Sequence, residues 1–481
     1  MSVFRSKIVC AGATLAIGVS LGAVEALAGG FTFPELGSKA VGRGGAYMLG
    51  ANGPEVIALN PALLTRLDGS KLTLDLHLHS LEASFARAGE NPNAEVDGTG
   101  FEPVEEELGL FPEPMFFASS DFGLDDLGFG IGIYGPNAVG RREFPEDGAQ
   151  RFQLIKSNLL EINFVGAAAW HWEGLSLGAS FGVASIDTEF TTVTSGALGA
   201  PNENPDDDTQ TNISVSDVKP TGIVGVAYDL MLGDGEGPRS SVSVGLSYEI
   251  PIDIEGEGTA KLTFGPTAAN FNARLKDDAA TFDSHEAGIV RASARYGHVD
   301  GGRELFDVEL MATFEQWSEQ KEFVVKVVGP VLLDIGNSTI ESEIAPTIIP
   351  KKWDDTVSVR LGGDLNLHEM FTVRVGGFTE TAAVPSSTSN VDFLSFNRLG
   401  VGLGASVYLG WADIDLGYMF IQNEDRTVTD GEVLVVAPLS GSNTKIVANN
   451  GDYKSSYQTL TVGMTFHFGA DDVVSTTPEV R

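Results

Sequence analysis

Apolar and polar residues alternate one by one along much of the chain. Residues 72–79 read Leu-Thr-Leu-Asp-Leu-His-Leu-His, so an extended backbone places the leucines on one face and the polar side chains on the other. The same two-residue period returns at 306–315, 357–361, 399–409, 413–420 and 459–468. A period of two is typical of a β-strand, whereas a helix repeats every 3.6 residues. The pattern predicts an all-β protein.

About fourteen strands are predicted from this alternation and from the turn residues between them. They are expected at 71–80, 114–120, 126–135, 157–170, 174–186, 220–230, 240–265, 286–297, 303–316, 354–366, 370–380, 398–409, 411–422 and 456–468. Pro251 would divide 240–265 into two strands and make the total odd. We keep it as one long, bent strand, because single-chain bacterial barrels have an even number of strands and both chain ends on one side.

The predicted connections alternate between short and long. The short ones are 121–125, 171–173, 231–239, 298–302, 367–369 and 410, and the long ones are 81–113, 136–156, 187–219, 266–285, 317–353, 381–397 and 423–455. A β-sandwich or a propeller also alternates apolar and polar positions but has no reason to sort its loops by length. Short turns at one end and long loops at the other are typical of a transmembrane barrel of the outer membrane.

The N-terminus has the features of a secretory signal peptide. Arg5 and Lys7 precede an apolar stretch from Ile8 to Val24, which is followed by Ala26-Leu27-Ala28. The stretch is short for a membrane-spanning helix, which disfavours an anchor. Cleavage after Ala28 would remove Cys10, the single cysteine of the chain, and with it any disulfide or thiolate chemistry.

The charge of the chain limits its partners. The 481 residues include 66 Asp and Glu against 30 Lys and Arg, for a net charge of −36. Such an excess would repel a phosphate backbone, so no nucleic-acid partner is expected. The acids concentrate in the predicted loops 81–113 and 203–208; binding of a hard cation is one interpretation, but without EF-hand spacing a solvated loop is favoured.

No cofactor, metal or catalytic site is predicted. The chain has no P-loop, G-x-S-x-G, H-E-x-x-H or CxxC motif, so we do not expect an enzyme. His77 and His79 share one strand face and have the spacing to bind a metal together. With no third ligand evident in the sequence, an ordinary lining of the barrel interior is favoured for them.

Residues 29–70 do not alternate and contain three short motifs: Gly29-Gly30-Phe31, Gly42-Arg43-Gly44-Gly45-Ala46 and Asn60-Pro61-Ala62-Leu63-Leu64. Asn-Pro commonly opens a turn or helix in any protein. Further segments follow in order at 114–117, 153–164, 245–248, 314–318 and 453–456. Together they resemble the FadL family of outer-membrane transporters of long-chain fatty acids and other hydrophobic compounds, over essentially the whole chain after residue 28.

The sequence pattern and the resemblance together divide the chain into four parts: a signal peptide (1–28), an N-terminal hatch in the lumen (29–70), a transmembrane β-barrel (71–468) and a polar tail (469–481). It implies that Phe31, Arg43, Asn60, Pro61 and Ala62 belong to the hatch. The sequence departs from the family at the acidic tail after Phe468 and at Asn52-Gly53-Pro54, where the family usually has acidic residues.

The resemblance also implies passive uptake: capture of an apolar ligand on outer loops, a pocket in the lumen, hatch movement and lateral exit into the bilayer. Lateral exit is physically reasonable, because apolar surface gains about 25 cal/mol per Å² only where it leaves water. The interruption that would form the exit is expected in the third strand, since glycine and proline weaken strand pairing. The residues concerned are Gly130, Gly132, Tyr134, Gly135 and Pro136; the alternative is that Gly135-Pro136 simply begins a loop.

Four arginines are expected to point into the lumen by strand parity: Arg291, Arg295, Arg360 and Arg374. Arginine binds a carboxylate headgroup with two parallel hydrogen bonds. Ordinary salt bridges with inward acids are the favoured alternative, the acids being Glu309, Glu315, Asp364, Asp413 and Asp415. Surface capture is assigned to the apolar loop residues Leu108, Leu110, Phe111 and Leu198.

Two functional classes therefore remain for the sequence. The first is a hydrophobe transporter, with long-chain fatty acids expected and aromatic hydrocarbons as the alternative. The second is a structural or surface-interaction barrel, such as an adhesin or receptor, although such a barrel needs no hatch. The expected surroundings are the outer membrane of a Gram-negative cell, with its lipid and lipopolysaccharide as partners, and the expected state is a monomer.

Overall fold

The computed structural model describes residues 32–33, 36–135, 137–138, 141–197, 200–233, 238–437 and 444–468. Several predictions lie outside these residues: the signal peptide, the polar tail, the two site residues Phe31 and Pro136, and the capture residue Leu198.

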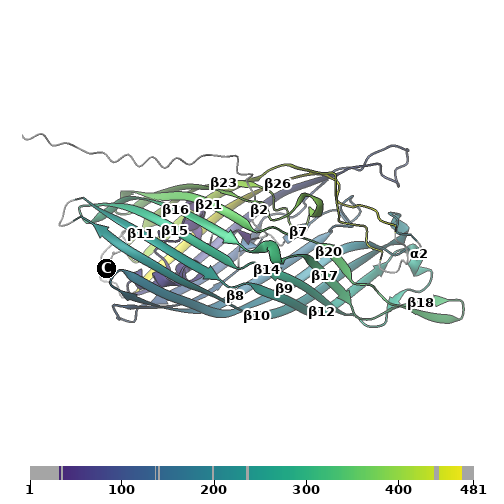
Figure 1. Cartoon of the computed structure of the whole chain (residues 1–481), viewed down its shortest axis with the longest axis horizontal. Coiled ribbons are helices and arrows are strands. Elements are labelled where there is room, and N and C mark those ends of the chain that lie inside the picture. Colours follow the sequence, from purple (N-terminus) through teal and green to yellow (C-terminus); the bar gives the residue numbers. More distant parts are fainter. Residues whose placement is uncertain are drawn as a thin grey trace, which may run out of the picture.

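The strands form one closed antiparallel barrel of fourteen strands, as predicted (Figure 1). The first and last strands close the ring, with Ser70 paired to Phe468 and Arg87 to Gly451. Around the barrel the strands are β2 (Ser70–Arg87), β4 (Phe111–Ser120), β5 (Leu127–Tyr134), β8 (Lys156–Trp172), β9 (Leu175–Ser195), β10 (Asp208–Leu232), β11 (Arg239–Glu249), β15 (Ile289–Asp300), β16 (Arg303–Glu315), β21 (Thr356–His368), β22 (Phe371–Glu380), β23 (Arg398–Tyr408), β24 (Ala412–Asn423) and β26 (Gly451–Phe468).

Four of these strands are interrupted and then continue. β12 (Ile252–Phe264), β14 (Ala279–Glu286), β17 (Glu322–Val327) and β20 (Thr347–Pro350) extend β11, β15, β16 and β21, and they pair with one another in the same order. The predicted long strand at 240–265 is therefore real, and its break falls at Ile250 and Pro251. Proline lacks the N–H that a ladder requires, which accounts for the break at this place.

The loops predicted at 187–219, 266–285 and 317–353 are partly wrong. β9 continues to Ser195, β10 begins at Asp208, and β14 and β17 lie within the other two segments. β10 has 25 residues, well beyond the roughly 9 to 11 needed to cross a membrane. The barrel wall therefore extends past the bilayer on this side.

The alternation changes phase where the wall leaves the bilayer. In the first half of β9 the exposed residues are apolar, as at Phe181 and Val183. In its second half the exposed residues are Asp187 and Glu189, and the apolar Phe190 is buried. An outward apolar face suits lipid and an outward charged face suits water. This reversal explains why a search for outward apolar stripes ended the strand too early.

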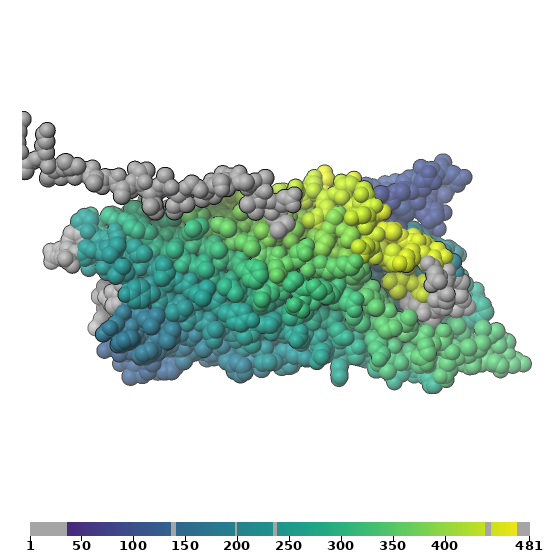
Figure 2. Space-filling model, in the orientation of Figure 1, coloured from purple at the N-terminus to yellow at the C-terminus, as the bar shows by residue number. Residues whose placement is uncertain are grey.

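The two ends of the barrel differ as the loop lengths predict. Short turns such as Gly301-Gly302 lie at one end, while the long connections, the helix α2 and the strand β18 lie at the other (Figure 1). In the space-filling view the flank is smooth and the projections gather at that second end (Figure 2). We refer to the second end as the loop end.

Smaller elements complete the fold. The strands are β1 (Thr32–Phe33), which pairs with β6 (Asn137–Ala138); β3 (Val104–Glu105), β7 (Arg141–Glu143) and β25 (Arg426–Val428), which pair with the barrel; and a separate sheet of β13 (Arg274–Leu275), β18 (Val331–Ile335) and β19 (Ser338–Ser342). The helices are α1 (Ser38–Gly42), α2 (Pro266–Ala269), and the 3-10 helices η1 (Pro54–Ala58), η2 (Pro61–Arg66), η3 (Pro205–Asp207), η4 (Trp317–Glu319) and η5 (Ser386–Thr388). Within the described ranges, each helix is too short or too polar to span a membrane.

Residues 36–69, which we call the N-terminal segment, lie inside the barrel (Figure 1, purple). Its residues from 36 to 67 are buried, apart from Gly50, Asn52 and Arg66, which are half-buried. α1 contacts β22, β23, β24 and β26, whereas η2 contacts β5, β8, β9 and β10 on another side of the ring. The segment thus spans the lumen from wall to wall.

Candidate functional site

Glycines on the inner wall make room for the N-terminal segment. A Cβ atom at Gly376 would overlap the carbonyl oxygen of Arg43, and one at Gly402 would overlap that of Val41. A Cβ at Gly128 would lie 2.5 Å from the carbonyl oxygen of Leu64. Backbone atoms cannot turn away as a side chain can, so these positions need glycine. The glycines that alternate with apolar residues in 398–409 therefore have a packing role.

Arg43, predicted to belong to the hatch, is fully buried and bound by acids of the adjacent wall strands β16 and β21. Its two terminal nitrogens donate to the two carboxylate oxygens of Asp307 at 3.0 and 2.6 Å, and one of them also donates to Asp364 at 2.7 Å. Its Nε donates to the carbonyl oxygen of Ala46 at 2.8 Å. Arginine is suited to such a fork because its donors are planar and always charged.

Glu309 fixes the chain that follows Arg43. One carboxylate oxygen accepts the N–H groups of Met48 and Leu49 at 2.9 and 2.7 Å, and the other accepts that of Gly50 at 2.8 Å. The residue is fully buried. A buried carboxylate is stable here because successive backbone donors satisfy it.

The Asn60-Pro61-Ala62 motif opens a helix, as Asn-Pro commonly does, and also contacts the wall. Asn60 begins η2 as its N-cap, since its side-chain oxygen accepts the N–H of Ala62 at 3.2 Å, and Pro61 occupies the first helical position. The Asn60 amide nitrogen also donates to the carbonyl oxygen of Val226 on the wall at 3.1 Å. The motif thus opens a helix and attaches it to β10.

Three further contacts hold the N-terminal segment to the wall. The N–H and hydroxyl of Ser38 each donate to Asp75 at 2.9 Å. Lys39 lies 3.8 Å from Asp415, and Arg66 lies 2.6 Å from Asp229. The basic residues of the segment thus face acids of the lumen, which explains part of the acid excess of the chain.

The hydrogen-bonded ladder of the wall is interrupted beside β5, and we call this interruption the wall gap. The ladder between β4 and β5 runs only from Phe116–Ile133 to Ser120–Phe129. Among the described residues, no ladder pairing joins β4 positions 111–115 to β5 or β7, because β5 ends at Tyr134 and β7 pairs with β8 alone. The unpaired stretch lies beside the third strand, and the exit predicted there stays a prediction.

The predicted kink residues have distinct surroundings. A Cβ at Gly130 would lie 2.5 Å from Ile57 Cδ1 of the N-terminal segment. Tyr134 stacks on Phe117 at 5.4 Å, and a Cβ at Gly132 would approach that same ring. Gly135 lies just past the end of β5, where a Cβ would lie 3.0 Å from an oxygen of Glu113. Gly130 therefore packs against the N-terminal segment, and Gly135 lies at the interrupted ladder.

The four inward arginines are all buried and each contacts an acid. Arg291 donates to Glu249 at 2.7 Å, Arg360 to Glu380 at 2.9 Å and Arg374 to Asp364 at 3.1 Å, and Arg295 donates to Glu304. The inward orientation is as predicted. Nε and Nη1 of Arg291 have no hydrogen-bond partner in the described part of the chain. Arg291 therefore retains donors for a ligand.

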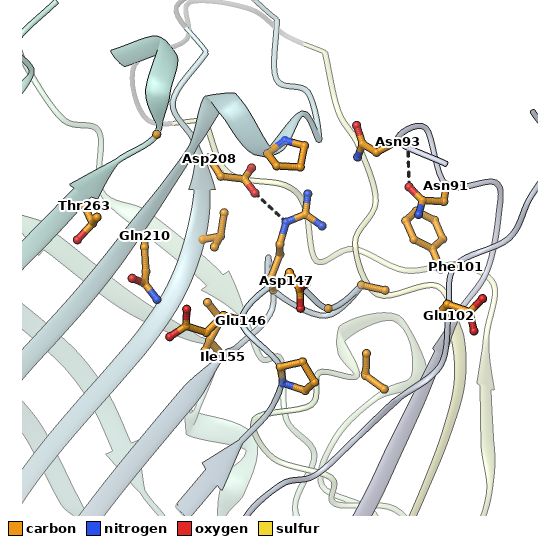
Figure 3. A pocket seen from close by; sticks show the side chains of 18 of the residues that line it. Asn91, Asn93, Phe101, Glu102, Glu146, Asp147, Ile155, Asp208, Gln210 and Thr263 are labelled. Atoms are coloured by element: carbon orange, nitrogen blue, oxygen red, sulfur yellow. Dashed lines mark hydrogen bonds and ion pairs between the residues drawn. The ribbon is translucent and has the colours of Figure 1, made fainter. Parts of the chain in front are cut away.

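A cavity of about 770 Å³ opens among the loops (Figure 3). Its apolar lining includes Phe101, Val104, Ile155, Val193 and Phe264, and Arg151 lies within it, paired to Asp208 at 2.8 Å. The volume is within the range usual for small-molecule pockets. Leu108, Leu110 and Phe111 do not line this cavity, and Leu110 is 72% exposed.

An aromatic cluster in the loop-end half of the lumen was not predicted. Phe282 and Phe323 lie 5.3 Å apart, and Phe393 contacts both Phe323 and Trp353 at 5.8 Å. Lys351 lies over the ring of Phe323 at 4.4 Å. Phe282 and Phe323 of this cluster lie at inward positions of β14 and β17. The reversed alternation of apolar and polar residues in such strand extensions is the sequence feature that could have predicted the cluster.

The closed barrel, the filled lumen and the gap in the wall define a plugged transmembrane barrel. The chain belongs to the family described as outer membrane protein transport protein (OMPP1/FadL/TodX), which matches residues 19–468. It is thus an outer-membrane transport protein, crossing the membrane with its strands.

Solved structures show the same fold at low sequence identity. A FadL homologue of Pseudomonas aeruginosa is 17% identical with a TM-score of 0.71, over 92% of this chain and 100% of that one. The toluene transporter TodX of P. putida is 14% identical with a TM-score of 0.61, over 91% and 100%. The toluene transporter TbuX of Ralstonia pickettii is 14% identical with a TM-score of 0.59, over 90% and 99%. A search of curated proteins gave no match.

Proposed function

We propose that the protein takes up hydrophobic small molecules passively across the outer membrane and releases them sideways into the bilayer. The observation that carries this proposal is the unpaired stretch at β4 positions 111–115, next to a lumen filled by the N-terminal segment. A ligand that leaves through such a gap passes directly into lipid, so its apolar surface does not return to water.

The loop-end cavity is the proposed place of capture. It combines apolar side chains such as Phe101 and Phe264 with a polar rim, as ligand pockets usually do. Leu108, Leu110, Phe111 and Leu198 remain proposed contacts for a ligand on its way to this cavity. From there the ligand would pass the aromatic cluster of Phe282, Phe323 and Trp353.

The N-terminal segment is the proposed hatch. Its charged contacts, from Lys39 to Arg66, join it to several strands without a covalent link. Ligand arrival would shift some of these contacts and open the path from the lumen to the gap. A purely structural barrel needs no such segment, which disfavours the adhesin or receptor alternative; we also propose that the protein acts as a monomer and catalyses no reaction.

Long-chain fatty acids are the proposed ligands, with Arg291 as the carboxylate partner. Its buried Nε and Nη1 are available to a headgroup. Changing Arg291→Gln should lower the affinity for a fatty acid about tenfold or more, since a hydrogen bond to a charged group contributes about 1.5–3 kcal/mol. The fatty alcohol of equal chain length is the control and should bind both proteins alike; equal loss for both ligands would refute the headgroup role.

Uncharged aromatic hydrocarbons are the second candidate. The capture cavity carries Glu102, Glu146 and Asp147 on its lining, which would repel a carboxylate. Toluene binding that is insensitive to Arg291→Gln, with weak fatty-acid binding by the unchanged protein, would favour this ligand class.

The gap is tested by a disulfide across it. Continuing the β4–β5 register would place Met115 opposite Tyr134, so the pair Met115→Cys and Tyr134→Cys would join the two edges. Uptake of a radiolabelled hydrophobe by cells should stop under oxidising conditions and recover with a reductant.

The matched control is the pair Ala118→Cys and Ile131→Cys, whose positions already face each other in the ladder. This disulfide should leave uptake unchanged. Full uptake through the oxidised Met115→Cys, Tyr134→Cys protein would contradict lateral exit.

A further inference from the structure

Two histidines and a glutamate meet on the inner wall between β2 and β4. His77 and His79 are two positions apart on β2, and Glu113 is paired directly opposite His77 on β4. One ligand atom from each of the three residues lies within 4.8 Å of the others. The glutamate is the third ligand that the sequence did not reveal, because the pairing of β2 with β4 brings it across a long loop.

The distances suit a single metal ion after small shifts of the three side chains. His79 Nε2 lies 2.9 Å from Glu113 Oε2. Ligand atoms around a tetrahedral zinc ion lie about 3.3 Å apart, given bonds of about 2.0–2.1 Å. Two imidazoles and one carboxylate form a donor set that binds Zn²⁺ and leaves a fourth position for water.

A hydrogen bond orients the imidazole of His79, and a carboxylate lies beside that of His77. His79 Nδ1 lies 3.0 Å from the hydroxyl of Thr459, and His77 Nε2 lies 3.3 Å from Asp75. Partners of this kind fix the tautomer and ring direction of metal-binding histidines. Phe111 stacks on His79 at 5.1 Å and covers one side of the site.

Glu113 has an oxygen that the protein does not satisfy. Its Oε1 is buried and has no hydrogen-bond partner in the described part of the chain. A buried carboxylate oxygen without a donor costs free energy unless a cation or a proton compensates it. The residue keeps 16% side-chain exposure, so the site can be reached from the lumen.

We propose that His77, His79 and Glu113 bind one Zn²⁺ ion. The site lies between the N-terminal segment, which Ser38 joins to Asp75, and the wall gap, where Glu113 lies against Gly135. The ion would clamp β2 to β4 at the edge of the gap. The binding itself does not depend on the proposed transport function.

The test is a titration of the purified, full-length protein in detergent with ZnCl₂ after treatment with a chelator. Calorimetry should show one saturable site per chain. His79→Ala and Glu113→Gln should each weaken binding by about tenfold or more, and Thr459→Val should weaken it by about tenfold through the orientation of His79. His171→Ala is the control, because its imidazole bonds to Ser176 and to the N–H of Gly174, away from the proposed site, and this variant should bind zinc as the unchanged protein does.

A readout on the unchanged protein makes the test independent of variant folding. X-ray absorption of the zinc-loaded chain should show two imidazoles and oxygen ligands around the ion. The absence of saturable binding, a shell of oxygen alone, or unchanged affinity in correctly folded His79→Ala and Glu113→Gln proteins would each overturn the site.

Discussion

At the scale of single residues, the interior of this barrel is governed by charge compensation. Arg43 has no exposed surface, yet it carries a full positive charge balanced by Asp307 and Asp364. Taking one partner out of such a pair leaves the others buried and uncompensated. Removing one partner therefore lowers the free energy of unfolding by more than the ion pair itself contributes.

We expect Arg43→Ala to reduce the free energy of unfolding by about 3–5 kcal/mol, the range for breaking a buried ion pair. The N-terminal segment should also become mobile, because its firmest contact with β16 is lost. Guanidinium unfolding in micelles measures the first effect, and increased ion conductance in planar bilayers measures the second.

Arg274→Ala is the matched control. Arg274 pairs with Asp334, but both side chains are more than a third exposed. Exposed pairs contribute about 0–1 kcal/mol. A similar loss of unfolding free energy in both variants would show that the burial of Arg43 does not strengthen its contribution to stability.

The inner glycines allow a second prediction. Gly376→Ala would place a methyl group on the carbonyl oxygen of Arg43, so it should cost about 1–3 kcal/mol as an overpacked site. Gly166→Ala, on β8, meets nothing within 4 Å and should be neutral. The midpoint of thermal unfolding compares the two; equal midpoints would mean that the segment does not need this glycine.

Residue orientation was largely predictable and residue partnership was not. Alternation correctly placed Arg291, Arg360 and Arg374 inside, because a strand has only two faces. It did not join Glu309 to the backbone of residues 48–50, nor Glu113 to His79, since those contacts depend on which strands are neighbours and how a loop folds back.

At the scale of elements, one carboxylate on β18 bonds to residues at or beside both neighbouring strands of the outer sheet, β13 and β19. Hydrogen bonds from Asn272, Thr339 and Arg274 lower the pKa of Asp334 to about 2. A lowered pKa means that the ionised form stabilises the folded sheet. This stabilisation is complete above the unfolded pKa of about 3.9 and is lost as the pH falls through about 2.

Nuclear magnetic resonance of the Asp334 side chain should therefore show a titration midpoint near 2. In Asn272→Ala the midpoint should move upward, because the first of these donors is removed. A midpoint near 3.9 in the unchanged protein would rule out the network around Asp334.

The strands themselves were predictable where they face lipid. The number of strands and the bend in 240–265 follow from alternation, parity and Pro251. The strand extensions toward the loop end were missed because water, not lipid, surrounds them. There the apolar residues face inward and the polar residues face outward, which is the reverse of the lipid-facing part. Asp187 and Glu189 outside with Phe190 inside are typical of a soluble sheet.

At the scale of the whole molecule, the basic residues of the N-terminal segment compensate acidic residues that line the lumen. Lys39, Arg43 and Arg66 contact a set of wall acids that comprises Asp229, Asp307, Glu309, Asp364, Asp413 and Asp415. Without the segment, the remaining arginines leave these acids partly uncompensated. Rings of acidic side chains select cations in channels.

Deletion of residues 36–69 should therefore give a wide, cation-selective pore. The reversal potential of the protein in a bilayer with a KCl gradient measures the selectivity. A heat-sensitive shift in gel migration relative to the unfolded chain verifies that the barrel has formed. Anion selectivity in a folded barrel would contradict this account of the lumen.

The wall-to-wall contacts of the N-terminal segment also constrain how the molecule is assembled. Its contacts come from both ends of the chain: Asp75 on β2, Gly128 on β5 and Gly402 on β23. These surfaces face one another only once the ring exists, and the ring closes between its first strand and its last. The N-terminal segment precedes every barrel strand in the chain, yet it is among the last parts to reach its final contacts. It must therefore avoid aggregation until all the strands of the barrel have been made.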